Sequence, residues 1–313
     1  MKEFGFGADL GGTTIKMGLF KTDGTLLEKW EIPTDTSNQG GNILRDIAAT
    51  VHNKMVEKEL TKDMVEGIGI GVPGAVDHHG VVNKAVNLGW GVLPVEEELE
   101  KLSGLKVKAG NDANVAALGE NWMGSGKGYD SLVMVTLGTG IGGGIIIDGR
   151  IVSGANGAGG EIGHIIVNDQ ELEACNCGHY GCIEQYASAT GIARMARRSM
   201  ATTTTESKLR TFGDQVSAKN VFDCAREGDK LACEVVEDVC NLLGATMAKI
   251  GCVVNPDVFV IGGGVSKAGQ ILLDNLMEPF RAQVFHAASE TPIVLASLGN
   301  DAGIYGAVRM ILD

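Results

Sequence analysis

A pattern of strand, glycine turn and strand occurs twice in this chain, at 8–20 (ADLGGTTIKMGLF) and at 135–147 (VTLGTGIGGGIII). Each copy passes from an apolar segment through a polar residue, Asp9 or Thr136, and Leu-Gly into a Gly/Thr turn, and then returns as an apolar segment. Repetition at about half the length of the chain indicates a duplicated domain with a cleft between the halves. Two glycine turns that face such a cleft can hold a polyphosphate from both sides.

The length and the order of the apolar segments predict an α/β fold of two domains. A chain of 313 residues is long for a single core, and apolar strands alternate with segments of helical spacing. We expect a smaller domain over 1–110, joined by a C-terminal helix over 301–313 that packs on it. The larger domain is expected over 111–300 and includes the cysteine-rich segment.

Charge and cysteine content exclude several classes of protein. The formal net charge is −13, and nucleic-acid binding needs a basic surface that displaces counterions, so we expect no nucleic-acid partner. The N-terminal residues MKEFGFGADLGG contain no secretory core, and no apolar run of about 18 residues occurs. A cytoplasmic protein without a membrane partner is therefore expected. Seven cysteines, an odd number, argue against a disulfide framework.

The first glycine turn carries donors that suit phosphate. In DLGGTTIK (9–16) the glycines allow backbone N–H groups to approach phosphate oxygens, and Thr13, Thr14 and Lys16 can donate to them. Asp9 can hold Mg²⁺ directly or through water. For one copy alone an ordinary hairpin turn is the alternative, but the second copy favours phosphate binding. The spacing differs from that of a Walker A loop.

A third glycine turn, GGGVS (262–266), follows the apolar strand VFVI. Such a turn leaves room for the base or ribose of a nucleotide, because no side chain blocks it. It is equally a plain strand-to-helix turn.

Asn111 and Asp112 stand where a strand is predicted to end and a helix to begin. Ligands of α/β sheets bind at the carboxyl ends of strands, and a carboxylate there can accept a proton from a substrate hydroxyl. The alternative role for Asp112 is the N-cap of the helix. Both roles can be filled if a neighbour caps the helix.

The segment CNCGHYGC (175–182) brings three cysteines together downstream of His164. Cys175, Cys177, Cys182 and His164 form a Cys₃His set, and four protein ligands make a zinc site structural. His179 is the rival fourth ligand, and unpaired buried thiols or a redox centre are the alternatives to zinc. The remaining cysteines lie in predicted helices without ligand-like neighbours, so core packing is expected for Cys224, Cys233, Cys240 and Cys252.

Together these motifs resemble the ROK family (repressors, open reading frames and sugar kinases). The motifs that carry the resemblance cover nearly the whole chain: DLGGTTIK, GVPGAVD, NLGW, GNDANVAALGE, TLGTGIGGGIIIDGRIVSGANGAGGEIGH, CNCGHYGCIEQYAS and VIGGGVS. The cysteine segment is similar to that of the glucokinase branch. The resemblance implies a two-domain actin/hexokinase-like (ribonuclease H-like duplicated) ATPase fold with an interdomain cleft.

The resemblance also implies roles for residues of this chain. It implies that Asp112 is the general base that activates the 6-hydroxyl of glucose, with ATP, Mg²⁺ and a structural Zn²⁺ as cofactors. The implied sugar ligands are Gly74, Asn87, Asn111, Asp112, Glu161, His164 and Glu184, and the implied zinc ligands are His164, Cys175, Cys177 and Cys182. The implied ATP-binding residues are Asp9, Gly11, Gly12, Thr13, Thr14, Lys16, Gly138, Thr139, Gly140, Gly262, Gly263 and Gly264.

Other functions stay open at this point. The substrate can be another hexose, such as N-acetylglucosamine, N-acetylmannosamine or mannose, and a non-catalytic sugar sensor is a further alternative. Repressors of the family carry an added N-terminal helix-turn-helix, whereas the first strand here is expected to begin near residue 4. The resemblance implies a homo-oligomer, either a dimer or a tetramer.

Overall fold

The computed structural model describes residues 2–312. The chain forms two compact units: unit 1 is Met1–Leu132, Gly144–Gly160 and Ser297–Asp313, and unit 2 is Val133–Gly143 and Glu161–Ala296. The predicted division of a smaller domain, 1–110 with 301–313, from a larger domain, 111–300, stays a prediction.

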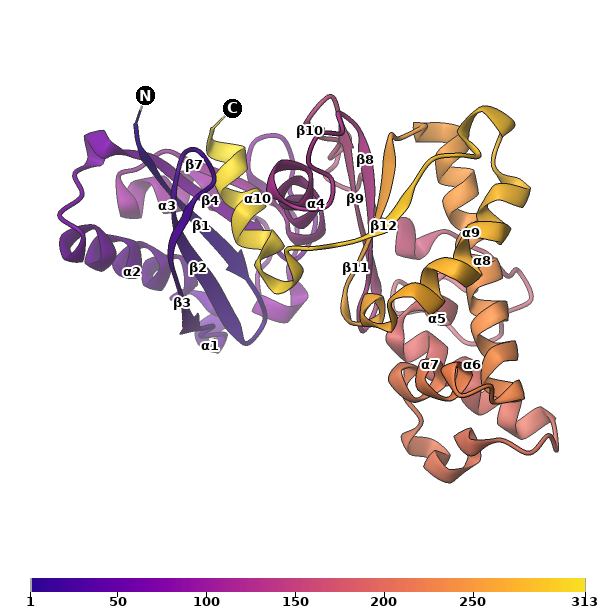
Figure 1. Cartoon of the computed structure of the whole chain (residues 1–313). Helices are drawn as coiled ribbons and strands as arrows, with labels where there is room; N and C mark the ends of the chain where they lie inside the picture. The colour runs from indigo at the N-terminus through magenta and orange to yellow at the C-terminus, as the bar shows by residue number, and fades with distance from the viewer. Residues whose placement is uncertain (1, 313) are drawn as a thin grey trace. The chain divides into compact units, whose positions relative to one another are not determined.

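Unit 1 is built around a five-stranded sheet (Figure 1). Its elements are β1 (Phe4–Leu10), β2 (Thr14–Lys21), β3 (Leu26–Pro33), the turn α1 (Ser37–Gly40), α2 (Ile43–Glu57), β4 (Val65–Val72), β5 (Val81–Val82), β6 (Leu93–Pro94), α3 (Val95–Ser103), β7 (Val107–Asn111), α4 (Asp112–Met123), β10 (Arg150–Ile151) and α10 (Ala302–Ile311). The strand order is β3-β2-β1-β4-β7. Strand β2 is antiparallel to β1 and β3, whereas β4 is parallel to β1 and β7.

Two glycines in the sheet of unit 1 allow α10 to pack directly on it. A Cβ atom on Gly69 of β4 would overlap the backbone of Ala307, and one on Gly7 of β1 would overlap the carbonyl oxygen of Ile304. The glycines therefore set how closely the helix approaches the strands.

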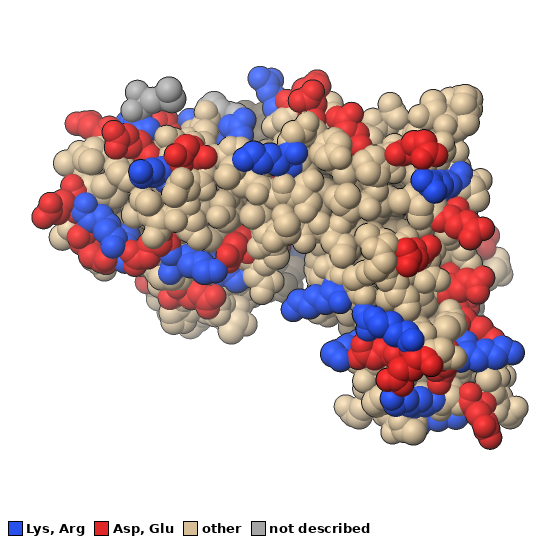
Figure 2. Space-filling view, viewed as in Figure 1, with Lys and Arg blue, Asp and Glu red and all other residues tan. Residues whose placement is uncertain are grey.

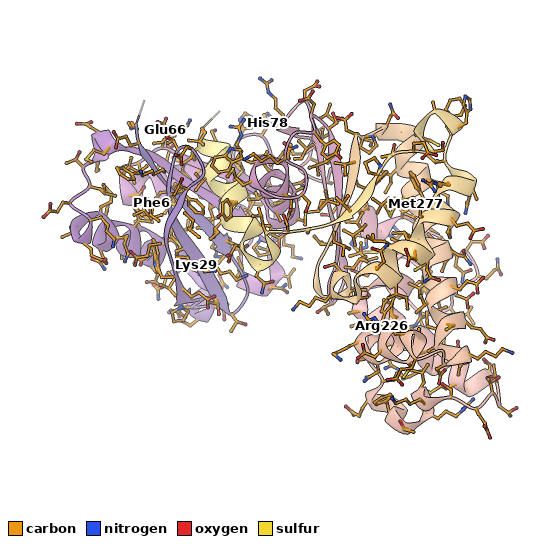
Figure 3. All side chains as sticks on the ribbon, viewed as in Figure 1. Phe6, Lys29, Glu66, His78, Arg226 and Met277 are labelled. Carbon is orange, nitrogen blue, oxygen red and sulfur yellow. The ribbon has the colours of Figure 1, made fainter. Side chains whose placement is uncertain are left out.

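On the sheet, Phe6 is fully buried and meets Trp30 edge-to-face, with ring centroids 6.4 Å apart (Phe6 is labelled in Figure 3).

Unit 2 combines strands of a second sheet with a group of helices. Its elements are β8 (Leu132–Leu137), β9 (Ile141–Ile147), α5 (Glu184–Ala187), α6 (Ala189–Thr202), α7 (Ala218–Arg226), α8 (Lys230–Val254), β11 (Val258–Gly262), α9 (Gln270–Gln283) and β12 (Ile293–Leu295). Strands β8 and β9 pass the boundary between the units by one and four residues, respectively. Phe259 of β11 and Phe280 of α9 are fully buried and pack edge-to-face, with ring centroids 5.5 Å apart.

The second sheet has the strand order β10-β9-β8-β11-β12. In chain order this repeats the arrangement of the first sheet, because in each case the first three strands form one side in reverse order and two later strands follow on the other side. The repeated glycine turns lie between β1 and β2 and between β8 and β9, at equivalent places in the two sheets.

The cysteines outside the metal-ligand set divide into two pairs. Core packing is confirmed for Cys224 and Cys240, which are buried, and it is wrong for Cys233 and Cys252, which are exposed. Cys233 and Cys252 lie on α8, a helix with one solvent-facing side, and a position in such a helix does not by itself mean burial.

Two features of the structure concern the membrane and nucleic-acid classes: the character of its helices and the distribution of charge on its surface. Among the described residues, no helix has both the length and the apolar character that a bilayer span requires. On the face shown in Figure 2, Lys and Arg side chains are interspersed with Asp and Glu side chains.

A fully buried carboxylate, that of Glu120, joins the end of α4 to the segment that leads into α10. Its oxygens accept hydrogen bonds from the backbone N–H groups of Ser125 (2.9 Å), Ser297 (3.2 Å) and Leu298 (2.8 Å), and Glu120 has no exposed surface. Ser297 is the residue at which the chain re-enters unit 1. The carboxylate therefore satisfies three part-buried backbone donors at once.

Glu120→Ala should lower the free energy of unfolding by about 2–4 kcal/mol, because it removes a fully buried side chain and leaves three part-buried N–H groups without their acceptor. Glu97→Ala is the matched control, since the Glu97 side chain is 64% exposed and pairs with Lys101. Denaturant unfolding of both variants measures the difference. Equal shifts in the two variants would contradict a structural role for the Glu120 hydrogen bonds.

Candidate active site

In unit 1, the predicted base lies at the carboxyl end of a buried part of the sheet. Val72 of β4 pairs with Asn111 of β7, so the two strands end together. The Asn111 side chain donates from Nδ2 to the carbonyl oxygen of Gly74 at 3.1 Å. Gly74 has a φ of +105°, a left-handed conformation that favours glycine, and a Cβ atom there would also press on the carbonyl of Lys84.

Asn111, and not Asp112, is the N-cap of α4. Its Oδ1 accepts from the N–H groups of Ala113 at 3.0 Å and Asn114 at 3.2 Å. Asp112 is the first residue of the helix, partly exposed, with its Oδ1 2.8 Å from the N–H of Ala113. Of the two roles open to Asp112 in the sequence, capping is thus taken by its neighbour.

The first glycine turn exposes backbone and donors. Gly12 and Thr13 are exposed at its tip, where a Cβ on Gly12 would meet open space. Lys16 Nζ lies 3.7 Å from Asp9 Oδ2 and donates to the carbonyl oxygen of Asn300 at 3.1 Å. Burial raises the pKa of Asp9 above its ordinary value, and the nearby Lys16 ammonium opposes that shift.

In unit 2, the second glycine turn packs against the predicted sugar ligand Glu184. Glu184 Oε2 accepts from the N–H of Ile141 at 2.9 Å, and a Cβ on Gly140 would overlap this carboxylate. The carbonyl of Gly138 accepts from the N–H of Ala189 at 2.8 Å, and that of Thr139 accepts from the Thr190 hydroxyl at 2.7 Å. The turn is therefore held by the start of α5 and of α6.

Glu161 and His164 lie near the same turn. A Cβ on Gly163, between them, would overlap the carbonyl oxygen of Ile141. His164 Nε2 lies 3.9 Å from Glu161 Oε2, and His164 Nδ1 lies 3.9 Å from the sulfur of Cys175. The two ring nitrogens thus face different groups, one a carboxylate and one the cysteine cluster.

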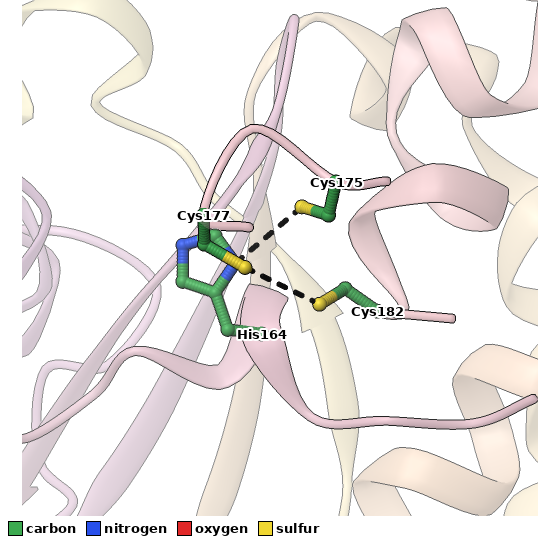
Figure 4. A group of neighbouring side chains, drawn as sticks. All are labelled: His164, Cys175, Cys177 and Cys182. Carbon is green, nitrogen blue, oxygen red and sulfur yellow. Dashed lines mark hydrogen bonds between the residues drawn. The ribbon is translucent and has the colours of Figure 1, made fainter. Parts of the chain in front are cut away.

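The four predicted metal ligands come together. One ligand atom from each of His164, Cys175, Cys177 and Cys182 lies within 4.8 Å of all the others (Figure 4). The sulfurs of Cys177 and Cys182 are 3.6 Å apart. Two sulfurs on a tetrahedral zinc are about 3.8 Å apart, because each Zn–S bond is about 2.3 Å long. The donor set and its spacing therefore fit a four-coordinate zinc ion.

His179, the rival ligand, is exposed and lies outside this group, with Nδ1 3.5 Å from the sulfur of Cys177. Without a metal, burial raises the pKa of Cys175 and raises that of Cys182 to about 12. Burial acts in the same direction on Cys177, but hydrogen bonds led by the backbone N–H of His179 lower its pKa to about 6. Since zinc binds thiolates, metal binding would release protons from this cluster.

A cavity of about 570 Å³ lies within unit 2, next to the second and third glycine turns. Gly263 has a φ of +80°, and a Cβ there would overlap the backbone of Leu137, so the two turns are in contact. Arg226 donates to the carbonyl oxygen of Ala268 at 2.6 Å at the cavity wall (Figure 3). The lining residues are Thr139, Ala189, Thr190, Ala193, Arg197, Val216, Ser217, Ala218, Lys219, Phe222, Asp223, Arg226, Gly264, Val265, Lys267 and Ala268.

Most of the lining was missed from the sequence, which identified only Thr139 and Gly264. The others stand on α6, on α7, in the two residues Val216 and Ser217 before α7, and in the 3-10 turn Gly264–Ala268, where small or mixed residues carry no distinctive motif. Among the predicted sugar ligands, Asn87 is exposed in the 3-10 turn Val86–Leu88, and none of the described contacts joins it to Asn111 or Gly74.

The family comparison agrees with the motifs. The ROK family profile matches residues 6–313. A glucokinase from Halalkalibacterium halodurans is 43% identical over 305 residues, covering 96% of this chain and 92% of that protein. An N-acetylgalactosamine kinase from Shewanella sp. (strain ANA-3) is 31% identical, covering 97% and 96% of the two chains.

Among solved structures, a ROK family glucokinase from Streptomyces griseus in complex with glucose and AMPPNP is 34% identical. The likeness covers 98% of both chains with a TM-score of 0.76. The predicted α/β fold class of the actin/hexokinase-like type is confirmed by this likeness. The chain belongs to the ROK family.

Proposed function

We propose that this chain is an ATP-dependent glucokinase, which transfers the γ-phosphoryl group of ATP to the 6-hydroxyl of glucose. The likeness to glucokinases along nearly the whole chain supports this activity. The observation that carries the proposed mechanism is the capping of α4 by Asn111, because it leaves Asp112 at the helix start without the capping role.

Asp112 is the proposed general base. Its carboxylate accepts the proton of the 6-hydroxyl while that oxygen attacks the γ-phosphorus. The bond between the γ-phosphorus and the β–γ bridging oxygen breaks, and ADP leaves with that oxygen. Asn111, Gly74, Glu161, His164 and Glu184 are the proposed sugar ligands. Asn87 is a further candidate, in the 3-10 turn Val86–Leu88. Carboxylates suit the task, since each can accept more than one hydroxyl hydrogen bond.

The cavity of unit 2 is the proposed pocket for the base and ribose of ATP. Apolar side chains such as Phe222 and Val265 line it, and it reaches Thr139 in the second glycine turn. The second and third glycine turns present backbone without side chains at Gly138, Gly140, Gly262, Gly263 and Gly264. A wall of this kind buries a flat base and leaves the phosphates near backbone N–H groups.

The first glycine turn, with Gly11, Gly12, Thr13 and Thr14 at its tip, is the proposed second phosphate contact. Lys16 would supply positive charge, and Asp9 would hold Mg²⁺ directly or through water. Mg²⁺ bound with ATP would neutralise charge on the phosphates. The Lys16 ammonium lies beside the Asp9 carboxylate, so a local positive charge would attract the phosphates although the net charge of the chain is negative.

His164, Cys175, Cys177 and Cys182 are the proposed ligands of a structural zinc. Glu184 follows Cys182 by one intervening residue, and Glu161 precedes His164 on the same 3-10 turn segment. A metal here would hold both carboxylates at fixed positions. His164 would bind the metal through Nδ1 and offer Nε2 to a sugar hydroxyl.

Two other activities remain as alternatives. The N-acetylgalactosamine kinase among the relatives keeps open another hexose, including N-acetylglucosamine, N-acetylmannosamine or mannose. A non-catalytic sugar sensor is less well supported, since Asp112 and both phosphate turns are present. A cytoplasmic place in glycolysis and a homodimer or homotetramer complete the proposal.

A coupled assay of ADP release tests the function. With Mg·ATP, glucose should be turned over faster than mannose, fructose, N-acetylglucosamine or N-acetylmannosamine, because a sugar that lacks or inverts a matched hydroxyl leaves proposed polar ligands unpaired. Preference for another of these sugars would replace glucose in the proposal. ATP-independent binding of a sugar without turnover of any would favour the sensor.

Asp112→Asn should lower kcat on glucose by about 10²-fold or more, the scale expected for loss of a general base, and leave glucose binding largely intact. Asp46→Asn is the control, because Asp46 is exposed on α2. Steady-state kinetics and calorimetric sugar binding measure the two effects. A kcat equal to that of the wild type would exclude Asp112 as the base.

The zinc proposal predicts one zinc ion per chain by elemental analysis. Cys182→Ser should lose the metal and raise the KM for glucose, because Glu184 loses its nearby anchor. Cys252→Ser is the matched control, since Cys252 is exposed on α8 away from the ligand set. Retention of zinc by Cys182→Ser would contradict the ligand assignment.

A further inference from the structure

The carboxylate of Glu171 is buried in the loop between His164 and Cys175, with 2% of its side chain exposed. Arg198 donates to it through two nitrogens, at 3.0 and 2.9 Å, and the Tyr186 hydroxyl donates at 2.6 Å. Arg194 forms an ion pair with it at 2.8 Å. The Arg198 guanidinium holds the pKa of Glu171 well below its usual range, so the carboxylate is ionised at neutral pH.

The partners of Glu171 stand on the elements that follow the metal-ligand loop. Tyr186 belongs to α5, two residues after the proposed sugar ligand Glu184, and Arg194 and Arg198 belong to α6, one turn apart. Arg194 also donates to the carbonyl oxygen of Gln185 at 3.1 Å. Glu171 is thus connected to both residues that come directly after Glu184.

Gln185 closes the same loop from the other side. Its Oε1 accepts from the N–H groups of Gly181 at 2.8 Å and Cys182 at 3.1 Å, and its Nε2 donates to the carbonyl oxygen of Glu173 at 2.9 Å. A residue just before the cysteine segment and the end of that segment are therefore joined through a side chain of α5.

A single helical turn such as α5 cannot hold its own conformation, because helix nucleation is unfavourable. A metal would fix only the Cys182 end of this turn. The Glu171 carboxylate fixes the other end through Tyr186 and Arg194, and a bidentate arginine contact restricts orientation as well as distance. Along the chain, Glu184 lies between these two anchors.

We propose that Glu171 is a positioning residue for sugar binding, which anchors the loop 168–182 on α5 and α6 and so holds Glu184 in place. The proposal rests on the proposed function, because it takes Glu184 as a sugar ligand. Glu171 acts through Tyr186, Arg194 and Arg198 and does not itself touch the sugar.

The test compares Glu171→Gln with Glu173→Gln. Glu173 pairs with the same two arginines, but its side chain is 65% exposed. Glu171→Gln should raise the KM for glucose by about tenfold, the scale seen when groups that orient ligands are removed, while kcat and the KM for ATP change by about twofold or less. It should also release zinc to a chelator about tenfold faster. Glu173→Gln should resemble the wild type in all four measurements.

A second variant separates positioning from loss of folding. In Glu171→Gln the new amide can present its NH₂ group to Arg198, so Glu171→Gln with Arg198→Gln should recover part of the lost glucose affinity. A simple loss of stability predicts no recovery. A glucose KM in Glu171→Gln equal to that in Glu173→Gln overturns the proposal. A fall in kcat and in thermal stability, together with a rise in the KM for glucose and in the KM for ATP, overturns it as well.

Wild-type turnover separates this proposal from the proposed function. If the wild type phosphorylates no glucose, the glucokinase assignment fails, and the zinc-release rates still decide whether Glu171 anchors the loop. Release at the wild-type rate from Glu171→Gln then overturns the anchor, and faster release supports it.

Discussion

The contact between the Glu184 carboxylate and the backbone of the turn 138–141 is the interaction around which the groups of unit 2 are arranged. The N–H of Ile141 donates to Glu184, and Gly140 leaves the space that the carboxylate fills. The carbonyl of the same Ile141 faces Gly163, which stands between Glu161 and His164. One residue of backbone therefore brings the second glycine turn together with the proposed sugar ligands.

Buried carboxylates recur in this chain and satisfy different donors. Glu120 accepts from backbone N–H groups at the segment that leads to α10, whereas Glu171 accepts from two arginines and a tyrosine. Either carboxylate would be costly to bury alone, because desolvation of a charge is opposed only by hydrogen bonds or by opposite charges. Both join segments that are distant in the sequence, and Glu120 ends the motif GNDANVAALGE, whereas Glu171 lies outside the motifs that carry the family resemblance.

Glycine has a comparable role in placing the elements. Gly7 and Gly69 let α10 approach the first sheet, and Gly263 lets the third glycine turn approach Leu137. In these cases the missing side chain permits backbone to lie against backbone. Such contacts convert a glycine-rich composition into defined distances between strands, helices and turns.

The sequence by itself determined the fold class, the repeated glycine turns and the grouping of the three cysteines, because these depend on local spacing and residue type. Two apolar strands around a Gly/Thr turn define a hairpin, and three cysteines within eight positions confine their sulfurs to a small volume. The motifs also place Asn111 and Asp112 together, but they cannot say which of the two caps the helix. That choice follows from backbone angles and from the contact of Asn111 with Gly74.

Only the tertiary structure decided the rest. It selected His164 over His179, exposed Cys233 and Cys252, and formed a cavity from residues of α6, α7 and the turn after β11. It also joined Glu171 to Arg198 across 27 positions. The physical reason is that each of these outcomes depends on how separate elements pack, and an acid in a loop and a base on a helix carry no mark of their pairing until packing removes water from both.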